Sequence, residues 1–159
     1  MSHKVLSIFG TRPEALKMVP ILKQLGKQSH LESIICSTGQ HKEMLDQVLD
    51  LFDLTLDYDL NIMAPNQNLV QLTSRALFEV DRVIKAVQPS LVLVQGDTTT
   101  TFVGAMASYY NKVPVAHIEA GLRTSDIYSP WPEEVNRKMT TAIAEMHFTP
   151  SHEAELNLL

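Results

Sequence analysis

The chain has 159 residues, 45% of them hydrophobic and 19% charged, a composition typical of one compact globular domain. A formal net charge of −5 at pH 7 argues against binding to nucleic acid or to an anionic membrane surface, both of which need a basic face. Cys36 is the single cysteine, and no apolar run approaches the ~20 residues of a membrane span, so we expect a cytoplasmic protein.

Short apolar, β-branched runs alternate with amphipathic helical patterns along the chain. In chain order we expect a strand at 5–9, a helix at 13–27, a strand at 31–37, helices at 41–52 and 68–88, a strand at 91–95, a helix at 99–111, a strand at 113–118, a helix at 132–144, a strand at 146–149 and a last helix capped by Ser151. Pro20 should kink or split the first helix.

The expected strands are apolar throughout and are separated by helices, which is typical of a parallel sheet covered on both faces. The predicted fold is therefore α/β and Rossmann-like, with residues 1–159 forming one domain. Sheets of this kind bind ligands beyond the carboxyl ends of their strands. The last expected helix has only just begun at residue 159, so we expect a second domain outside this chain.

The segment Gly10–Glu14 after the first strand lacks the glycine pattern of a dinucleotide site and the Gly-Lys-Ser/Thr of a P-loop, so no cofactor is expected. Thr11 and Glu14 have capping-box spacing, which by itself explains a helix start. It does not explain Arg12 and Lys17, because cations oppose the dipole at a helix amino terminus. An anionic ligand would reverse that preference, so Arg12 and Lys17 are candidate ligand-binding residues.

Two carboxylates end neighbouring strands of the predicted sheet. Asp97 follows the strand at 91–95, and Glu119 ends the next strand, one helix and one strand later. A parallel sheet brings both to the same edge. For Asp97 the alternative is a simple helix cap, while the threonines at 98–101 are poor helix starters whose hydroxyls could line a polar site. His117 is expected to be structural.

A stiff loop, Ser129-Pro130-Trp131-Pro132, leads into the helix that begins with Glu133 and Glu134. Acids in a first helical turn are favoured by the dipole, which is a sufficient structural reason for both. The loop nevertheless follows the strand of Glu119, so it could fold over the same edge. The six histidines are scattered and make no convincing metal set, so no metal is expected.

Four segments, at 9–14 (FGTRPE), 96–101 (GDTTTT), 119–124 (EAGLRT) and 130–137 (PWPEEVNR), closely resemble the bacterial, non-hydrolysing UDP-N-acetylglucosamine 2-epimerases, and the resemblance covers the whole chain. It implies the first of two Rossmann-like domains in the glycosyltransferase-B arrangement, and a homodimer. It also implies that Asp97, Glu119 and Glu133 are catalytic acids and that Arg12 and Lys17 contact the substrate. Two positions depart from the family pattern, where Gln95 replaces a common histidine and Ala116 a common glycine.

The implied reaction interconverts UDP-N-acetylglucosamine and UDP-N-acetylmannosamine for cell-envelope polysaccharide synthesis. It proceeds by elimination of UDP to 2-acetamidoglucal, followed by re-addition. The fragment alone is expected to be inactive, because the resemblance places the rest of the site in the second domain. Two alternatives stay open: a nucleotide-sugar glycosyltransferase of the same architecture, and a non-catalytic binding or dimerisation domain that offers the helix at 68–88 to a partner.

Overall fold

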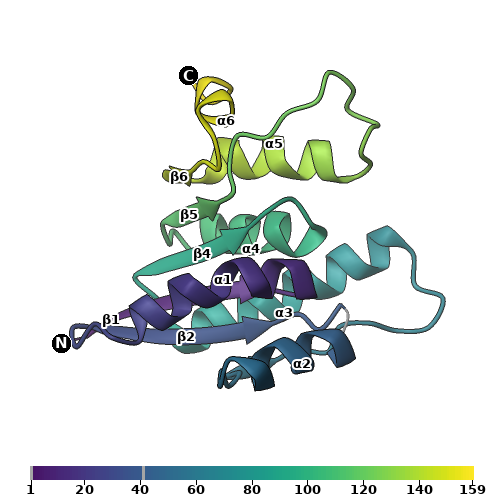
Figure 1. Cartoon of the computed structure of the whole chain (residues 1–159). Helices are drawn as coiled ribbons and strands as arrows, with labels where there is room; N and C mark the ends of the chain where they lie inside the picture. Colours follow the sequence, from purple (N-terminus) through teal and green to yellow (C-terminus); the bar gives the residue numbers. More distant parts are fainter. Residues whose placement is uncertain (1, 41) are drawn as a thin grey trace.

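Six parallel strands form the sheet at the centre of the computed structural model, which describes residues 2–40 and 42–159 (Figure 1). The strands are β1 (His3–Phe9), β2 (Leu31–Ser37), β3 (Tyr58–Asp59), β4 (Leu91–Gln95), β5 (Val115–Ile118) and β6 (Met146–Phe148). They lie in the order β3-β2-β1-β4-β5-β6. The five strands predicted from apolar runs are confirmed. The two-residue β3 was not predicted, because it has no apolar run of its own.

Helices cover both faces of this sheet, as predicted. They are α1 (Arg12–Leu25), α2 (Lys42–Leu51), α3 (Leu69–Val87), α4 (Thr99–Tyr110), α5 (Glu133–Ile143) and the short α6 (His152–Leu156). The helix predicted at 41–52 corresponds to α2, and its first residue, His41, lies outside the described residues. Helices α1 and α2 pack together, whereas α3, α4 and α5 pack in sequence on the opposite face (Figure 1).

The alternation of side chains along β1 supplies both halves of the core. Val5 and Phe9 pack with α1 and α2, whereas Leu6 and Ile8 pack with α3 and α4. Leu6, Ile8 and Phe9 are fully buried. A strand that is apolar on both faces is what a sheet between two helical layers requires, so the sequence pattern and the layer order agree.

Helix α1 contains Pro20 but is one continuous element, so the predicted split does not occur. Proline has no N–H to donate to the carbonyl oxygen of Leu16, four residues earlier. Pro20 is exposed and so is Leu16. Water can therefore satisfy the carbonyl that the proline leaves free, and the helix continues.

The register of β4 and β5 determines where their loops meet. Val94 pairs with His117 and Gln95 with Ile118, and the Gly96 N–H donates to the Ile118 carbonyl at 2.9 Å, which extends the pairing past the end of β4. The residues that follow, Asp97 on one strand and Glu119 on the other, therefore emerge side by side at the carboxyl edge of the sheet.

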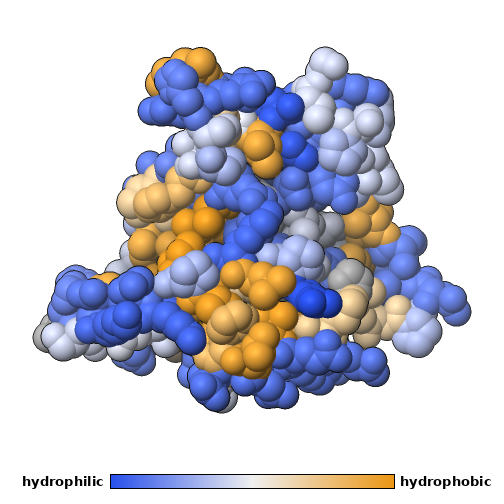
Figure 2. All heavy atoms as spheres, viewed as in Figure 1, coloured by the Kyte–Doolittle hydropathy of each residue, from blue (hydrophilic) through white to orange (hydrophobic). Residues whose placement is uncertain are grey.

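An apolar hollow of about 370 Å³ lies on the face that α1 covers, beside that helix. Its floor includes Leu93 and Ile118, and the half-exposed Phe148 forms part of its rim. Figure 2 views this face and shows hydrophobic residues grouped beside α1 within a largely hydrophilic surface. Among residues 2–40 and 42–159, no helix has the length and hydrophobicity needed to cross a bilayer.

Candidate active site

Lys17 and Glu119 form an ion pair at the carboxyl edge of the sheet. Lys17 projects from the second turn of α1, and its Nζ lies 2.5 Å from Oε2 and 2.6 Å from Oε1 of Glu119. Glu119 directly follows β5 and has a φ of 65°, a left-handed conformation that is uncommon for a residue with a side chain. Two residues predicted separately, one as a cation for an anionic ligand and one as an acid, are thus in direct contact.

Asp97 is the second acid at this edge, and its ion pair comes from α5. The Arg137 guanidinium Nη2 lies 2.8 Å from Oδ2 of Asp97. Burial raises the pKa of Asp97 above its ordinary value of 3.8; the positive charges of Arg137 and Lys17 oppose this rise, whereas Glu133 and Glu119 add to it. Asp97 therefore lies close enough to both glutamates for their charges to act on it.

Glu133 is the first residue of α5 and is partly exposed above the site. Its negative charge raises the pKa of Asp97, which places it with the other two acids. Arg12 is not part of this group. It is exposed at the first position of α1, and it is not among the charges that act on Asp97 in the described part of the chain. The structure thus brings Asp97, Glu119, Glu133 and Lys17 together and leaves Arg12 outside this group.

The turn that carries Asp97 is fixed from both sides. His117 is fully buried, and its Nε2 lies 2.6 Å from the Gly96 carbonyl oxygen. Burial lowers the pKa of His117 to about 4, so at neutral pH the ring is uncharged and can donate one N–H to this carbonyl. On the other side, the Asn136 Nδ2 donates to the Asp97 carbonyl oxygen at 3.0 Å. The structural role expected for His117 agrees with these contacts.

Glycine is required at Gly96, which immediately precedes Asp97. Its φ of 75° lies in the left-handed region, where a side chain would be strained. The His117 contact and this conformation together turn the chain sharply out of β4. Strand β4 therefore ends at Gln95, and Asp97 lies in the turn that follows.

The alternative that Asp97 merely caps α4 is wrong. Thr98 is the N-cap residue, and its hydroxyl accepts the Thr101 N–H at 3.3 Å. The N-cap side chain makes this contact, and Asp97 lies one residue before the N-cap position. Asp97 is thereby left without a capping role, and its carboxylate is free to face Arg137 and the two glutamates.

The threonine run does not line an open site, contrary to our expectation. Thr99, Thr100 and Thr101 are buried, and the hydroxyls of Thr98, Thr100 and Thr101 make hydrogen bonds within the protein. Thr101 Oγ1 donates to the Gln95 carbonyl oxygen at 2.6 Å, and Thr98 Oγ1 donates to Glu14 Oε1 at 2.6 Å. These side chains therefore join α4 to the end of β4 and to the start of α1.

Glu14 is the buried partner that completes this connection. Its Oε2 accepts the N–H groups of Gly10 and Thr11 at 2.9 and 2.8 Å, which is the glutamate half of the predicted capping box. Burial raises the pKa of Glu14, and its hydrogen bonds with Thr98 and with both N–H groups oppose that rise. Gly10 is tightly enclosed here, since a Cβ would lie 2.0 Å from the Thr38 hydroxyl.

A shallow hollow of about 220 Å³ opens beside Glu119, at the carboxyl ends of β4, β5 and β6. Lys17 and Glu119 form one wall, and Phe148 with Pro150 forms the other. Within the described residues, no group of three or more histidine, cysteine or acidic side chains has the arrangement of a metal site. The hollow thus offers a cation and an acid next to an apolar surface.

Two residues of α5, Asn136 and Arg137, are important to this site and were not singled out from the sequence. Glu134 is fully buried, whereas Glu133 is not, and Asn136 and Arg137 both contact Asp97. The spacing of Glu133, Asn136 and Arg137 is i, i+3, i+4, which puts them on one face of a helix. This spacing is visible in the sequence and indicates a shared helix face. It does not reveal which strand of the sheet that face contacts.

The family model described as UDP-N-acetylglucosamine 2-epimerase matches residues 23–159. The chain belongs to this family. It is 53% identical over 156 residues to the UDP-N-acetylglucosamine 2-epimerase of Neisseria meningitidis, covering 98% of this chain and 42% of that protein. It is equally 53% identical over 156 residues to the enzyme of the same name from Bacillus subtilis, covering 41% of it. The chain therefore spans about two-fifths of the length of these epimerases.

Solved structures of epimerases share the fold closely. The enzyme from Neisseria meningitidis bound to UDP-GlcNAc superposes with a TM-score of 0.95 at 52% identity, over 98% of this chain and 42% of that one. The enzyme from Methanocaldococcus jannaschii, in complex with UDP-GlcNAc and UDP, gives 0.91 at 36% identity, over the same shares of the two chains. MurG of Acinetobacter baumannii is only 16% identical, with a TM-score of 0.64 over 92% of this chain and 40% of that one, and shows the common glycosyltransferase-B-type fold alone.

Proposed function

We propose that the natural-length protein interconverts UDP-N-acetylglucosamine and UDP-N-acetylmannosamine without net hydrolysis. The observation that carries the proposal is the group of three carboxylates, Asp97, Glu119 and Glu133, gathered at one sheet edge with the ammonium group of Lys17. Membership of the epimerase family and the ligands bound to its solved relatives support a UDP-sugar as the substrate.

The chemistry of the substrate explains a need for several acids. The proton on carbon 2 of the sugar is not adjacent to a carbonyl group, so direct removal and return would be very slow. In the proposed route a carboxylate takes this proton while the bond between carbon 1 and the UDP oxygen breaks, and a double bond forms between carbons 1 and 2. UDP then adds back to carbon 1 of this 2-acetamidoglucal, and carbon 2 receives a proton on the opposite face.

The environment of Asp97 suits such a division of roles. Its pKa is raised by burial and by the charges of Glu133 and Glu119, so the three acids do not all ionise independently. One can donate a proton while another accepts one. We propose that Asp97, Glu119 and Glu133 share these two roles.

The cations of α1 suit the other half of the reaction. The departing diphosphate gains negative charge as its bond to carbon 1 breaks, and a positioned cation stabilises that charge. Lys17 stands in the site beside Glu119, and Arg12 lies exposed one turn earlier on the same helix. We propose that both contact the substrate, with Lys17 nearer to the reacting carbons.

The remainder of the site is proposed to come from a second domain, because the chain matches only 42% of the length of relatives such as the Neisseria meningitidis enzyme. Closure of two domains over the edge would exclude water and retain the glycal intermediate. Accordingly we propose that the 159 residues alone do not turn over UDP-N-acetylglucosamine. Measurable turnover by the isolated chain would contradict this point.

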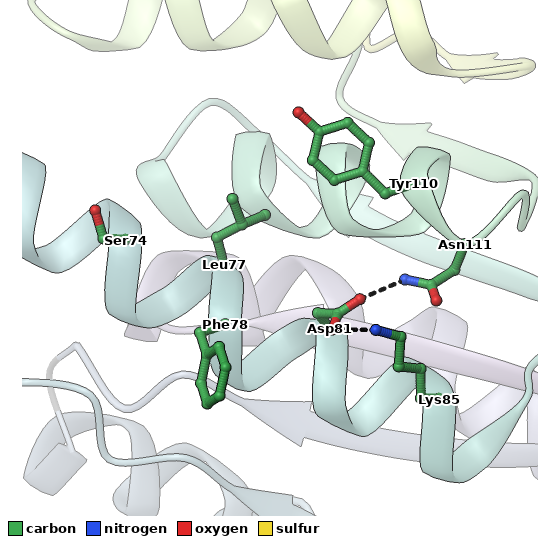
Figure 3. Close-up of a pocket in the computed structure, with 7 residues that line it drawn as sticks. All are labelled: Ser74, Leu77, Phe78, Asp81, Lys85, Tyr110 and Asn111. Atoms are coloured by element: carbon green, nitrogen blue, oxygen red, sulfur yellow. Dashed lines mark hydrogen bonds and ion pairs between the residues drawn. The ribbon is translucent and has the colours of Figure 1, made fainter.

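A homodimer through the α3–α4 face is also proposed. Phe78 on α3 and Tyr110 on α4 are 63% and 65% exposed, although both are large and apolar or aromatic. They border a hollow of about 520 Å³ whose polar side is the Asp81–Lys85 ion pair, at 2.8 Å (Figure 3). Exposed apolar side chains around a groove with a few polar groups are typical of a protein interface.

The proposed setting is the cytoplasm, where the product would enter the synthesis of cell-envelope polysaccharide. The one cysteine, Cys36, is buried and free, and burial raises its pKa to about 12, so it is an unreactive thiol. The role in polysaccharide synthesis rests on the proposed reaction, and a different activity would remove its basis.

Exchange of the carbon-2 proton tests the proposed reaction. The natural-length protein is incubated in heavy water with UDP-N-acetylglucosamine, and carbon 2 is followed by NMR. An epimerase that works by elimination must place deuterium at carbon 2 of the product and of recovered substrate. A glycosyltransferase would leave carbon 2 protonated and would need an acceptor, and a non-catalytic binding domain would change neither molecule.

A further inference from the structure

Arg137 of α5 is almost fully buried, with 9% of its side chain exposed, and ends at the carboxylate of Asp97. Its Nη2 lies 2.8 Å from Asp97 Oδ2. An arginine buried this deeply needs counter-charges, since an unpaired buried cation is very costly. Asp97, whose side chain is 29% exposed, supplies one of these counter-charges.

Glu134 supplies the other counter-charge from behind. It is fully buried, its Oε2 lies 3.6 Å from Arg137 Nε, and its Oε1 lies 3.0 Å from Lys138 Nζ. Its Oε2 also accepts the N–H of Thr124, at 3.1 Å, in the loop that follows β5. Burial raises the pKa of Glu134, but these hydrogen bonds and the neighbouring cations together outweigh it, so the pKa lies below its ordinary value.

The contacts run from Glu134 through Arg137 to Asp97. Glu134 accepts a hydrogen bond from the backbone of the loop after β5, and Arg137 links it to Asp97, which follows β4. Neither Glu134 nor Arg137 lines the hollow beside Glu119. Their side chains are 0% and 9% exposed, against 29% for Asp97, so they can act on Asp97 with little surface of their own open to a ligand.

We infer that Arg137, held by Glu134, is a positioning residue for the reaction: it fixes the orientation of the Asp97 carboxylate and stabilises its ionised form. The inference deepens the proposed function and rests on it for the catalytic consequence. The structural relationship between Arg137 and Asp97 is independent of that function and can be tested separately.

The charges that face Asp97 decide what removal of Arg137 would do. From α5 they are Arg137 and Glu133, from the end of β5 Glu119, and from α1 Lys17. Arg137 is the stronger of the two cations in its effect on Asp97, and it opposes burial. Without it, burial and the two glutamates act with only Lys17 against them, so the pKa of Asp97 must rise further.

Three substitutions in the natural-length protein separate charge, geometry and local packing. Arg137→Met removes the charge, and Arg137→Lys keeps it but loses the planar fork that can hold a carboxylate in one orientation. Lys138→Met is the matched control, because Lys138 also pairs with Glu134 from the same helix but is 42% exposed and is not among the charges that act on Asp97.

Two readouts are measured for each variant. The first is the titration of the Asp97 side chain by NMR with ¹³C-labelled aspartate, its signal assigned by its loss in Asp97→Asn. The second is the pH dependence of carbon-2 deuterium exchange. A residue with only a structural role would lower thermal stability without moving either pH profile.

The expected result is that Arg137→Met raises the pH at which Asp97 titrates, moves the Asp97-dependent limb of the exchange profile in the same direction, and lowers kcat by about ten- to a hundredfold. Arg137→Lys should keep the titration near that of the wild type while losing part of kcat. Lys138→Met should keep both profiles. An unchanged Asp97 titration in folded Arg137→Met would overturn the inference.

A second variant covers the case in which Arg137→Met does not fold. The double substitution Glu134→Gln with Arg137→Gln removes both charges of the buried pair, so that no uncompensated carboxylate is left at position 134. Asp97 should again titrate at higher pH, and an unchanged titration would again overturn the inference. If the wild type shows no carbon-2 exchange at all, the proposed function fails, while the Asp97 titration still decides whether Arg137 controls its ionisation.

Discussion

Lys17 Nζ lies 2.5 Å from Oε2 of Glu119, although the two residues are 102 positions apart in the chain. The contact ties the second turn of α1 to the end of β5, across the strand β4 that carries Asp97. It places a cation directly beside an acid at the edge where a parallel sheet binds its ligands. Lys17 can therefore both hold Glu119 and meet an anionic substrate.

Lys17→Met should lower kcat/KM for UDP-N-acetylglucosamine by about a hundredfold in the natural-length protein, because it removes a cation aimed at the developing charge of the leaving group. Lys17→Arg keeps the charge and should retain more of the activity. Initial rates of epimerisation, followed by NMR, give both values.

Lys23→Met is the matched control for Lys17. Lys23 lies in the last turn of the same helix, with its ammonium group 5.2 Å from the centre of the Phe52 ring and away from the acids. The kcat/KM of Lys23→Met should stay close to that of the wild type. Equal losses in Lys17→Met and Lys23→Met would mean that α1 stability, rather than the cation, accounts for the effect.

Thr101→Val should destabilise the fold by about 1–3 kcal/mol, because valine has nearly the same shape but leaves the buried Gln95 carbonyl without its 2.6 Å hydrogen bond. Urea unfolding of the two proteins measures the difference. Thr73→Val on α3 is the comparison. Its hydroxyl donates to the Leu69 carbonyl within the helix, at 2.8 Å, so a smaller loss is expected. Equal losses would contradict the special role of Thr101.

His117 should make the stability of the protein depend on pH in the acid range. Burial lowers its folded-state pKa to about 4 from an ordinary value of 6.5. Between these values the unfolded chain binds more protons than the folded one. The free energy of unfolding is therefore greatest above pH 6.5 and falls as the pH drops through this window, by up to about 3 kcal/mol.

His117→Gln removes this titration while keeping a side-chain N–H for the Gly96 carbonyl. Urea unfolding at several pH values between 4 and 7.5 should show a shallower decline for the variant. His30→Gln, at an exposed turn position, controls for the substitution itself. A decline as steep in His117→Gln as in the wild type would show that other groups account for it.

Replacing both Phe78 and Tyr110 by aspartate should halve the molar mass of the natural-length protein in light scattering after size exclusion. Two charges placed on each copy of the α3–α4 face would be buried against like charges in a dimer. Leu51→Asp is the control, because Leu51 is 73% exposed on α2, away from that face. A dimer that survives the double substitution would exclude this face as the interface.

Much of the fold follows from local patterns in the sequence. Strands β1 and β4 contain the apolar runs from which they were predicted, and helix α3 has an apolar stripe and the Asn68 capping box at its start. The short β3 was missed because two residues carry no periodicity. Pro20 was expected to kink or split α1. The split does not occur, and the exposure of Pro20 and Leu16, which a sequence does not give, explains why.

The position of the site is predictable from the sequence, whereas many of its contacts are not. The carboxyl ends of β4 and β5 can be identified from their apolar runs, and this places Asp97 and Glu119 on one edge. Glu133 and Glu134 are adjacent in one helical turn, and only packing reveals that Glu134 is buried behind Asp97 while Glu133 faces the site. Contacts between distant elements, such as Arg137 with Asp97, depend on how helices cross the sheet and have no local signal.

The central claim is that acids at this edge move the carbon-2 proton, and carbon-2 deuterium exchange in variants of the natural-length protein tests it most directly. Asp97→Asn and Glu119→Gln should each abolish exchange while the protein stays folded and continues to bind UDP-N-acetylglucosamine. Asp50→Asn, an exposed acid on α2, should exchange at the wild-type rate. Near-normal exchange in Asp97→Asn or in Glu119→Gln would contradict the account.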